Sequence, residues 1–305
     1  MNNKFKSILK SMRLRTLPLS LAGSMLGVLL ALADYQISGL VIFFILLTTV
    51  CLQILSNLSN ELGDYLKGTD TPDRQGPQYE LSQGNLTVKE MKRMIRIFVI
   101  LSAVSGMAMI YSSFGTFFSL ESLLLMLLGA SAIASGMKYT LGKNPYGYMG
   151  LGDLFVFIYF GIVSVLGSYF VAAHTIPNAW LILPAVSIGL FSIAVLNINN
   201  IRDMKTDKKN RVTVAILLGT RKAKIYETVL IVLGWVSMVA YCLVRIFDPW
   251  HYLFVLTLPL YILALRWIWT REDKALDPVL PLLVISTFVL ALLTGLGFTM
   301  YLFFI

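Results

Sequence analysis

Long apolar runs recur along this chain, and they limit its fold more than any other feature of the sequence. Nine can be counted, at residues 17–33, 39–58, 94–114, 117–137, 154–173, 179–198, 225–246, 253–269 and 280–304. The hydrocarbon core of a bilayer is about 30 Å thick and needs around 20 apolar residues per helix. Only helices and closed barrels span lipid, and runs of this length are helices. We therefore predict an all-α integral membrane protein with nine transmembrane helices, forming a single domain over residues 1–305.

Charged residues are scarce and lie on one side of the predicted spans. They make up 13% of the sequence, against about 25% in soluble domains, which excludes a soluble fold. Of the 25 Lys and Arg residues, 24 lie before the first run, in the even-numbered connections or, for Arg96 and Arg266, in the adjoining ends of runs, and only Arg245 falls on the other side. Because basic residues collect in cytoplasmic loops, we expect a multi-pass protein of the bacterial cytoplasmic (inner) membrane. Its N-terminus and long loops are predicted to be cytoplasmic and its C-terminus outside.

Two local signals concern single helices. The first run follows basic residues and ends in Ala31-Leu32-Ala33, which also fits a cleaved signal peptide. Pro18, Gly23 and Gly27 within that run favour a retained helix instead. Further along, Thr87-Val88-Lys89-Glu90 predicts a capping box at the approach to the third helix.

Polar residues gather at the ends of the second and sixth runs, beside the two longest connections on the basic side. At helical spacing each group lies on one face, and we name the two groups the first and second stripes. The first stripe is Asn57, Asn60, Glu61 and Asp64, and the second is Asn200, Asp203 and Asp207. Asn60 and Asn200 are 140 residues and four spans apart, so both stripes face the same side, as in a parallel internal repeat.

The chemistry of the stripes indicates a metal and a phosphate ligand. Carboxylate and amide oxygens suit Mg²⁺, which binds through one or two carboxylates together with substrate phosphates. Basic residues of the same loops are candidates to contact the remaining phosphate oxygens. These are Lys67, Arg74, Arg202, Lys208 and Arg211. One stripe alone fits a solvated helix end, but two in matching positions favour a functional site, since polar residues in membrane segments are costly.

Several motifs resemble the UbiA superfamily of membrane prenyltransferases, over nearly the whole chain. They are Arg15-Thr16-Leu17-Pro18; Asn60-Glu61-Leu62-Gly63-Asp64; Lys67-Gly68-Thr69-Asp70 through Asp73-Arg74-Gln75-Gly76-Pro77; Tyr139-Thr140; Asn144-Pro145-Tyr146-Gly147-Tyr148 with Gly150-Leu151-Gly152-Asp153; and Asn199-Asn200-Ile201-Arg202-Asp203 with Asp207. The runs that begin at Lys67 and Asn144 are the most specific. They resemble the branch of the superfamily that prenylates 1,4-dihydroxy-2-naphthoate.

The resemblance implies nine helices around a central cavity, capped by the two aspartate-bearing loops. A polyprenyl diphosphate would bind through Mg²⁺ and ionise to an allylic cation, which the dihydroxynaphthoate ring attacks. Loss of CO₂ then gives demethylmenaquinone. Metal ions and cations stabilise the departing diphosphate, and a cavity screened from water protects the cation. The catalytic residues would be Asp64, Asp203, Asn60 and Asn200, and the metal ligands Glu61, Asp64, Asp203 and Asp207.

Candidates to bind the acceptor, and three departures from the family pattern, complete the predicted site. The candidates are Arg15, Tyr139, Asp153 and Asp70. The first three also have structural interpretations, as an interface anchor, a belt aromatic and a helix cap respectively. Glu61 stands where the family usually has Asp, and Tyr79 where it often has Arg. The loop after Asp207 is one residue shorter than in the family and lacks its usual Gly.

Two other functions remain open from the sequence. A different aromatic acceptor, such as 4-hydroxybenzoate or homogentisate, would require the same metal and diphosphate site. A secondary transporter would be expected to carry its ionisable residues in mid-helix, whereas here they lie at helix ends. We infer lipid, the prenyl diphosphate and the acceptor as partners, and neither nucleic acid nor an obligate protein partner.

Overall fold

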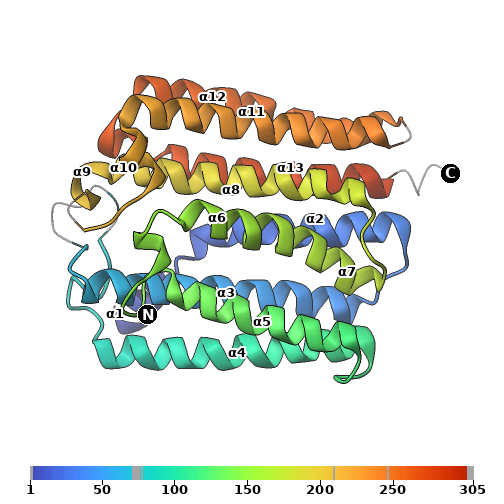
Figure 1. Ribbon diagram of the computed structural model, residues 1–305, viewed down its shortest axis with the longest axis horizontal. Helices are drawn as coiled ribbons and strands as arrows, with labels where there is room; N and C mark the ends of the chain where they lie inside the picture. The colour runs from blue at the N-terminus through green and yellow to red at the C-terminus, as the bar shows by residue number, and fades with distance from the viewer. Residues whose placement is uncertain (1–2, 71–75, 77, 209, 246, 301–305) are drawn as a thin grey trace.

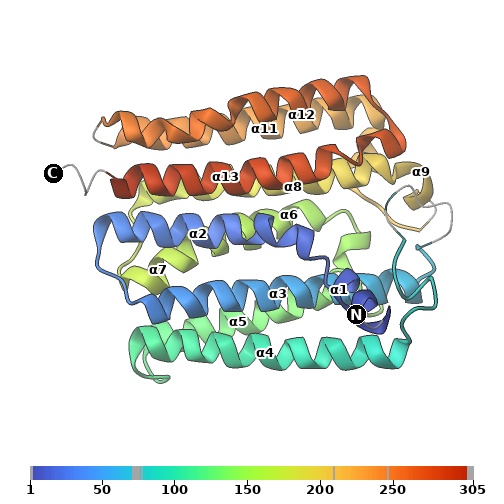
Figure 2. The same cartoon turned by 180° about the vertical axis from the view of Figure 1, so that it is seen from behind.

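The protein is a bundle of long helices that lie side by side, as the computed structural model shows in Figure 1. The structure describes residues 3–70, 76, 78–208, 210–245 and 247–300. Within these ranges, nine helical segments are long and apolar enough to cross a membrane, which confirms the predicted fold class. Helix α1 (Asn3–Ser11) and the end of α13 (Val279–Met300) lie at opposite ends of the bundle, as an odd number of crossings requires (Figure 2).

Several of the nine segments consist of a long helix joined to shorter helical turns, and the nine segments are given next in chain order. They are α1, η1 (Leu14–Thr16) and α2 (Leu17–Asp34); α3 (Gly39–Leu66); α4 (Val88–Phe114); α5 (Leu120–Lys138); α6 (Gly152–Val156), η3 (Phe157–Gly167) and α7 (Ser168–Ala173); η4 (Ala179–Leu181) and α8 (Ile182–Arg202); α11 (Thr220–Val244); η5 (Pro249–Thr257) and α12 (Leu258–Thr270); and η6 (Asp273–Leu276) and α13. Helix α4 begins at the predicted capping box, in which Thr87 and Glu90 exchange hydrogen bonds. It therefore starts six residues before the apolar run does.

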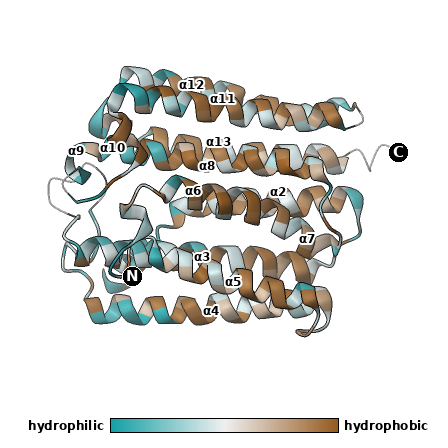
Figure 3. Ribbon diagram, in the orientation of Figure 1, coloured by the Kyte–Doolittle hydropathy of each residue, from teal (hydrophilic) through white to brown (hydrophobic). Residues whose placement is uncertain are grey.

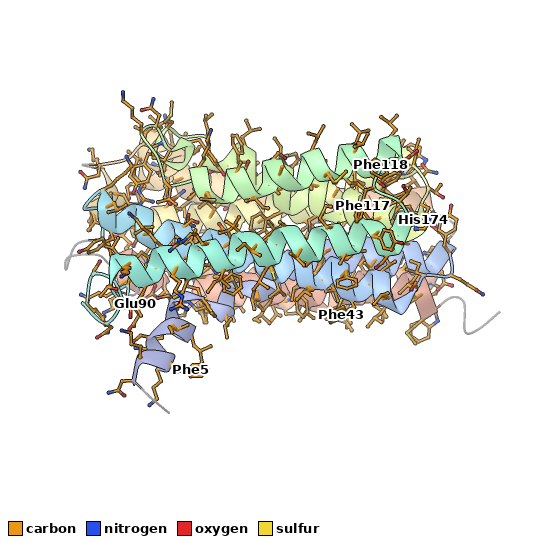
Figure 4. All side chains as sticks on the ribbon, turned by 90° about the horizontal axis from the view of Figure 1, so that it is seen from below. Phe5, Phe43, Glu90, Phe117, Phe118 and His174 are labelled. Carbon is orange, nitrogen blue, oxygen red and sulfur yellow. The ribbon has the colours of Figure 1, made fainter. Side chains whose placement is uncertain are left out.

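Hydrophilic residues concentrate at one end of the bundle, which we name the polar end. Figure 3 shows hydrophobic residues along the middle of the helices and hydrophilic ones around α9 (Met204–Asp207) and the adjoining end of α3. Figure 4 shows Phe5 and Glu90 at this end, and Phe117, Phe118 and His174 at the other. The connections that bear the two stripes therefore meet on one side of the bundle.

Helix α8 is the most buried of the nine segments, and it holds the second stripe in a fixed place. It packs against α11, α13 and η3. Some of its polar groups form hydrogen bonds inside the bundle, as where Ser187 Oγ donates to Gly234 O at 2.7 Å. By contrast, α5 is the least buried segment and packs mainly on α3 and α4.

Glycine permits the closest approach between α2 and η3. A Cβ atom built on Gly27 would lie 2.3 Å from the carbonyl oxygen of Val165, far inside van der Waals contact. Small residues of this kind let membrane helices bring their backbones together. Gly129 in α5 differs, because a Cβ atom there meets nothing within 4 Å.

We expect Gly27→Ala to destabilise the protein by about 1–3 kcal/mol, because the added methyl group must push two helix backbones apart. Gly129→Ala is the matched control, since the same change in open space leaves stability unchanged or raises it by up to about 1 kcal/mol. Thermal unfolding of the detergent-purified variants measures both effects. An equal response of the two variants would contradict the close packing of α2 on η3.

Candidate active site

The carboxylate of Asp64 lies at the polar end of α3, where three segments of the chain meet. The residue is 4% exposed, and its Oδ1 accepts hydrogen bonds from Tyr148 Oη at 2.8 Å and from Arg211 Nη2 at 2.9 Å. Thr69 closes the turn after α3, because its backbone N–H donates to Asp64 O and its hydroxyl lies 2.9 Å from Tyr148 Oη. Asp64 is therefore fixed by both a phenol and a guanidinium.

Asp203 in the second stripe is held by its neighbour Arg202. The guanidinium donates from Nε to Oδ1 at 2.9 Å and from Nη2 to Oδ2 at 2.7 Å, a bidentate pair that sets both distance and orientation. Arg202 also donates to Asn199 and Asp277 at 2.8 Å each, and it is 2% exposed. These contacts show Arg202 positioning Asp203, while its predicted contact with a diphosphate stays a prediction.

Arg211 joins the two stripes. Its Nη2 donates to Asp64, and its Nε lies 3.5 Å from Asp207 Oδ2. The guanidinium also lies 4.6 Å from the centre of the Tyr148 ring. Burial opposes the charge of Arg211, but Asp64 and Asp207 outweigh it and hold the pKa of the guanidinium above its ordinary value. The structure thus brings together three predicted site residues, Asp64, Asp207 and Arg211.

A short backbone bridge keeps Arg211 beside Tyr148. Met149 and Val212 pair as an isolated parallel bridge, and Val212 N–H donates to Tyr148 O at 3.0 Å. Tyr148 comes from η2 (Tyr146–Tyr148), in the connection between α5 and α6. Sequence reasoning did not assign Tyr148 to the site, although the residue belongs to the motif that begins at Asn144.

The remaining residues of the first stripe contact other parts of the chain, and Asn200 of the second stripe is described with them. Glu61 is buried and accepts from Ser11 Oγ at 3.2 Å and from Leu81 N–H at 3.1 Å. Asn57 donates to Met12 O at 2.9 Å, so both side chains hold the N-terminal segment against α3. Asn60 accepts from Thr140 Oγ1 at 3.3 Å, and Asn200 is buried in α8. The predicted metal-binding role of Glu61 stays a prediction.

Among the four candidate acceptor residues, Tyr139 interacts electrostatically with Asp64 and Asp207. Burial raises the pKa of Tyr139 to about 12, against the effect of Arg211 and together with that of Asp64. Asp153 at the start of α6 also acts on Tyr139, and it accepts from Tyr226 Oη at 2.9 Å. Asp70 accepts from Ser82 Oγ, and Arg15 lies exposed in η1. Lys208 is exposed after α9, and Arg74 lies outside the described residues.

A cavity of about 560 Å³ opens next to Tyr148. Its lining consists of Lys67, Lys143, Asn144, Pro145, Tyr148, Met149 and Asn210. Lys67 Nζ lies 5.5 Å from the centre of the Tyr148 ring, and Tyr148 lines the cavity while its hydroxyl donates to Asp64. Sequence reasoning missed Lys143, whose only signal was its place directly before Asn144-Pro145. Two lysines here provide donors for an anionic ligand.

Comparison with known proteins identifies the family. The model of the UbiA prenyltransferase family matches residues 20–283. The chain belongs to this family. It is 39% identical to 1,4-dihydroxy-2-naphthoate octaprenyltransferase of Escherichia coli (strain K12), over 97% of this chain and 94% of that protein. The protein of the same name in Haemophilus influenzae is 36% identical, over 97% and 96% of the two chains.

Solved structures of the UbiA family share the fold. A UbiA homolog from Aeropyrum pernix K1 superimposes with a TM-score of 0.68 at 16% identity, covering 97% of this chain and 98% of that one. A homolog from Archaeoglobus fulgidus, bound to GPP and Mg²⁺, gives 0.63 at 15% identity, covering 94% and 99%. This UbiA-family protein is therefore a multi-pass membrane prenyltransferase, as predicted.

The donor set of this UbiA prenyltransferase fits a divalent ion that arrives with phosphate. Among the described residues, no three Asp, Glu, His or Cys side chains lie close enough to hold an ion by themselves. Mg²⁺ on a diphosphate needs only one or two carboxylates, because phosphate oxygens and water complete its coordination. Arg211 already places a positive charge between Asp64 and Asp207, so these two oxygen donors face a position that favours a cation.

We expect Tyr148→Phe to lower prenyl transfer about tenfold or more. The variant keeps the ring beside Arg211 but loses the hydroxyl between Thr69 and Asp64, and a hydrogen bond to a charged group contributes about 1.5–3 kcal/mol. Tyr65→Phe is the control, because Tyr65 follows Asp64 in α3 but is exposed. Initial rates in purified, detergent-solubilised protein test this, and identical rates for both variants would remove Tyr148 from the site.

Proposed function

We propose that this protein transfers a polyprenyl group from a polyprenyl diphosphate to 1,4-dihydroxy-2-naphthoate with loss of CO₂, which gives demethylmenaquinone in its reduced form. The observation that supports the chemistry best is the meeting of Asp64 and Asp207 on Arg211, next to a cavity that bears two lysines. The identity of 39% and 36% to proteins named for this acceptor supports the choice of substrate.

The polar end would bind the diphosphate. Asp64, Asp203 and Asp207 would hold Mg²⁺, which neutralises charge that develops on the departing diphosphate when it is bound. Lys67 and Lys143 face the same cavity and donate to phosphate oxygens. These groups together favour breakage of the carbon–oxygen bond, whose two electrons leave with the diphosphate.

An aromatic series leads from this site along α6 and η3, where it can stabilise the allylic cation. Tyr139 and Tyr146 meet edge to face at 5.4 Å, and Tyr146 stacks on Phe155 at 3.9 Å. Phe155 then stacks on Tyr159 at 6.4 Å. Ring faces attract a cation without supplying a nucleophile that would trap it. The rings also exclude water, which would otherwise hydrolyse the cation.

The acceptor ring attacks the allylic carbon, and a carbon–carbon bond forms at the ring carbon that bears the carboxylate. The bond to that carboxylate then breaks, its electrons return to the ring and CO₂ leaves. Asp153, which accepts from Tyr226 and acts electrostatically on Tyr139, would bind a ring hydroxyl of the acceptor. Arg15 and Asp70 are the further acceptor candidates. The polar end would face the cytoplasm of a bacterial inner membrane, because 24 of 25 basic residues belong to that side.

The first experiment uses membranes from cells that overproduce the protein, supplied with Mg²⁺, octaprenyl diphosphate and 1,4-dihydroxy-2-naphthoate. Mass spectrometry should detect the prenylated naphthoquinone, and excess chelator should abolish it. We expect Asp64→Asn to reduce the rate about a hundredfold or more, because an electrostatic stabiliser is lost. Asp273→Asn, an exposed carboxylate paired with Lys205, should leave the rate unchanged. Wild-type activity of Asp64→Asn, or in chelator, would refute the proposed site.

The acceptor is tested in the same membranes by replacing the naphthoate with 4-hydroxybenzoate or homogentisate. We expect product from the naphthoate and none from the other two acids. Prenylation of either acid in its place would keep the diphosphate chemistry and assign another acceptor. If well-folded protein transfers no prenyl group to any of the three, uptake measurements in proteoliposomes would test the transporter alternative.

A further inference from the structure

The guanidinium of Arg211 lies where the proposed site requires a metal-bound diphosphate. Asp64 and Asp207 come from helices α3 and α9, and Arg211 contacts both at 2.9 and 3.5 Å. All three side chains are at least nine-tenths buried. The positive charge of Arg211 therefore lies against both carboxylates before any ligand binds.

One donor of this guanidinium is unsatisfied. Arg211 Nε is buried and has no hydrogen-bond partner among the described residues, and its 3.5 Å approach to Asp207 Oδ2 is an ion-pair contact only. A buried donor without an acceptor is costly, and a ligand oxygen placed there would remove that cost. An anion that placed an oxygen next to Nε would therefore complete the hydrogen bonding of Arg211.

Arg211 is expected to repel a free divalent cation but to attract a metal-bound diphosphate. A free cation that approaches Asp64 and Asp207 encounters Arg211 within a few ångströms, where burial strengthens repulsion between like charges. A diphosphate brings its own negative oxygens, which give Arg211 a new bidentate partner while the metal takes the carboxylates. The exchange needs only a movement of the side chain, because the bridge between Met149 and Val212 holds the backbone next to Arg211.

We propose that Arg211 is an internal counter-ion that the metal–diphosphate complex displaces, so that the site binds metal and diphosphate together and discriminates against free metal. The inference rests on the proposed function and adds an order of binding to it. Asp203 is not part of the exchange, since Arg202 holds it through separate hydrogen bonds.

The test measures binding of Mn²⁺, a paramagnetic substitute for Mg²⁺, to the full-length protein in detergent by electron paramagnetic resonance, with and without inorganic pyrophosphate. We expect the wild type to bind Mn²⁺ weakly alone and at least tenfold more tightly with pyrophosphate. Arg211→Gln should bind Mn²⁺ alone at least tenfold more tightly than the wild type does, and pyrophosphate should enhance its binding much less.

Two further variants control for charge and folding. Lys205→Gln removes one positive charge from α9, but Lys205 is exposed and pairs with Asp273, so Mn²⁺ binding should match the wild type. Arg211→Lys keeps the charge and should keep the weak binding of free Mn²⁺, which tests the proposal even if Arg211→Gln does not fold. An Arg211→Lys protein that binds free Mn²⁺ tenfold more tightly would overturn the proposal.

The outcomes also separate this inference from the proposed function. If folded Arg211→Gln binds free Mn²⁺ no more tightly than the wild type, while the wild type still binds Mn²⁺ with pyrophosphate, the counter-ion role is wrong and the proposed function stands. If the wild type binds no Mn²⁺ with either pyrophosphate or a prenyl diphosphate, the metal–diphosphate site itself is wrong.

Discussion

The structure depends on how carboxylates at the end of a membrane bundle are neutralised. Asp64 and Asp207 come from helices far apart in the sequence, and buried like charges would separate those helices. Arg211 lies between them and makes their proximity favourable. Tyr148 adds a hydroxyl to Asp64 and a ring face to Arg211, so the connection between α5 and α6 is drawn into the same cluster. Three parts of the chain are thereby held against the guanidinium of Arg211.

Most of the fold could be predicted from the sequence, because the signal for a membrane helix is local. Hydropathy predicted the nine segments found among the described residues, and the capping box predicted the start of α4, which hydropathy alone placed six residues late. The common side of the two stripes followed from counting spans. The contacts that each residue of a stripe makes could not be predicted in this way. Glu61 and Asp64 are three residues apart and so differ by about 60° around the helix, enough for separate partners.

The parts of the site that sequence reasoning missed come from connections between helices. Tyr148 and Lys143 have no periodic pattern to mark them, and Tyr148 adjoins the bridge between Met149 and Val212. Glu61 was assigned by its spacing, but its observed partners, Ser11 and Leu81, lie in segments whose paths hydropathy does not determine. Spacing along one helix indicates which residues can share a face, while partners are chosen by tertiary packing.

Two arginines of one connection illustrate how similar ion pairs serve different tasks. Arg202 makes at least four hydrogen bonds and is 2% exposed, so a ligand could bind it only by breaking contacts that hold Asp203. Arg211 has an unpaired buried Nε and one long contact, so a ligand that supplies oxygens gains more than it disrupts. The protein thus combines a fixed carboxylate with two exchangeable ones. A rigid part keeps the geometry of the site while the exchangeable part admits and releases a highly charged substrate at the membrane surface.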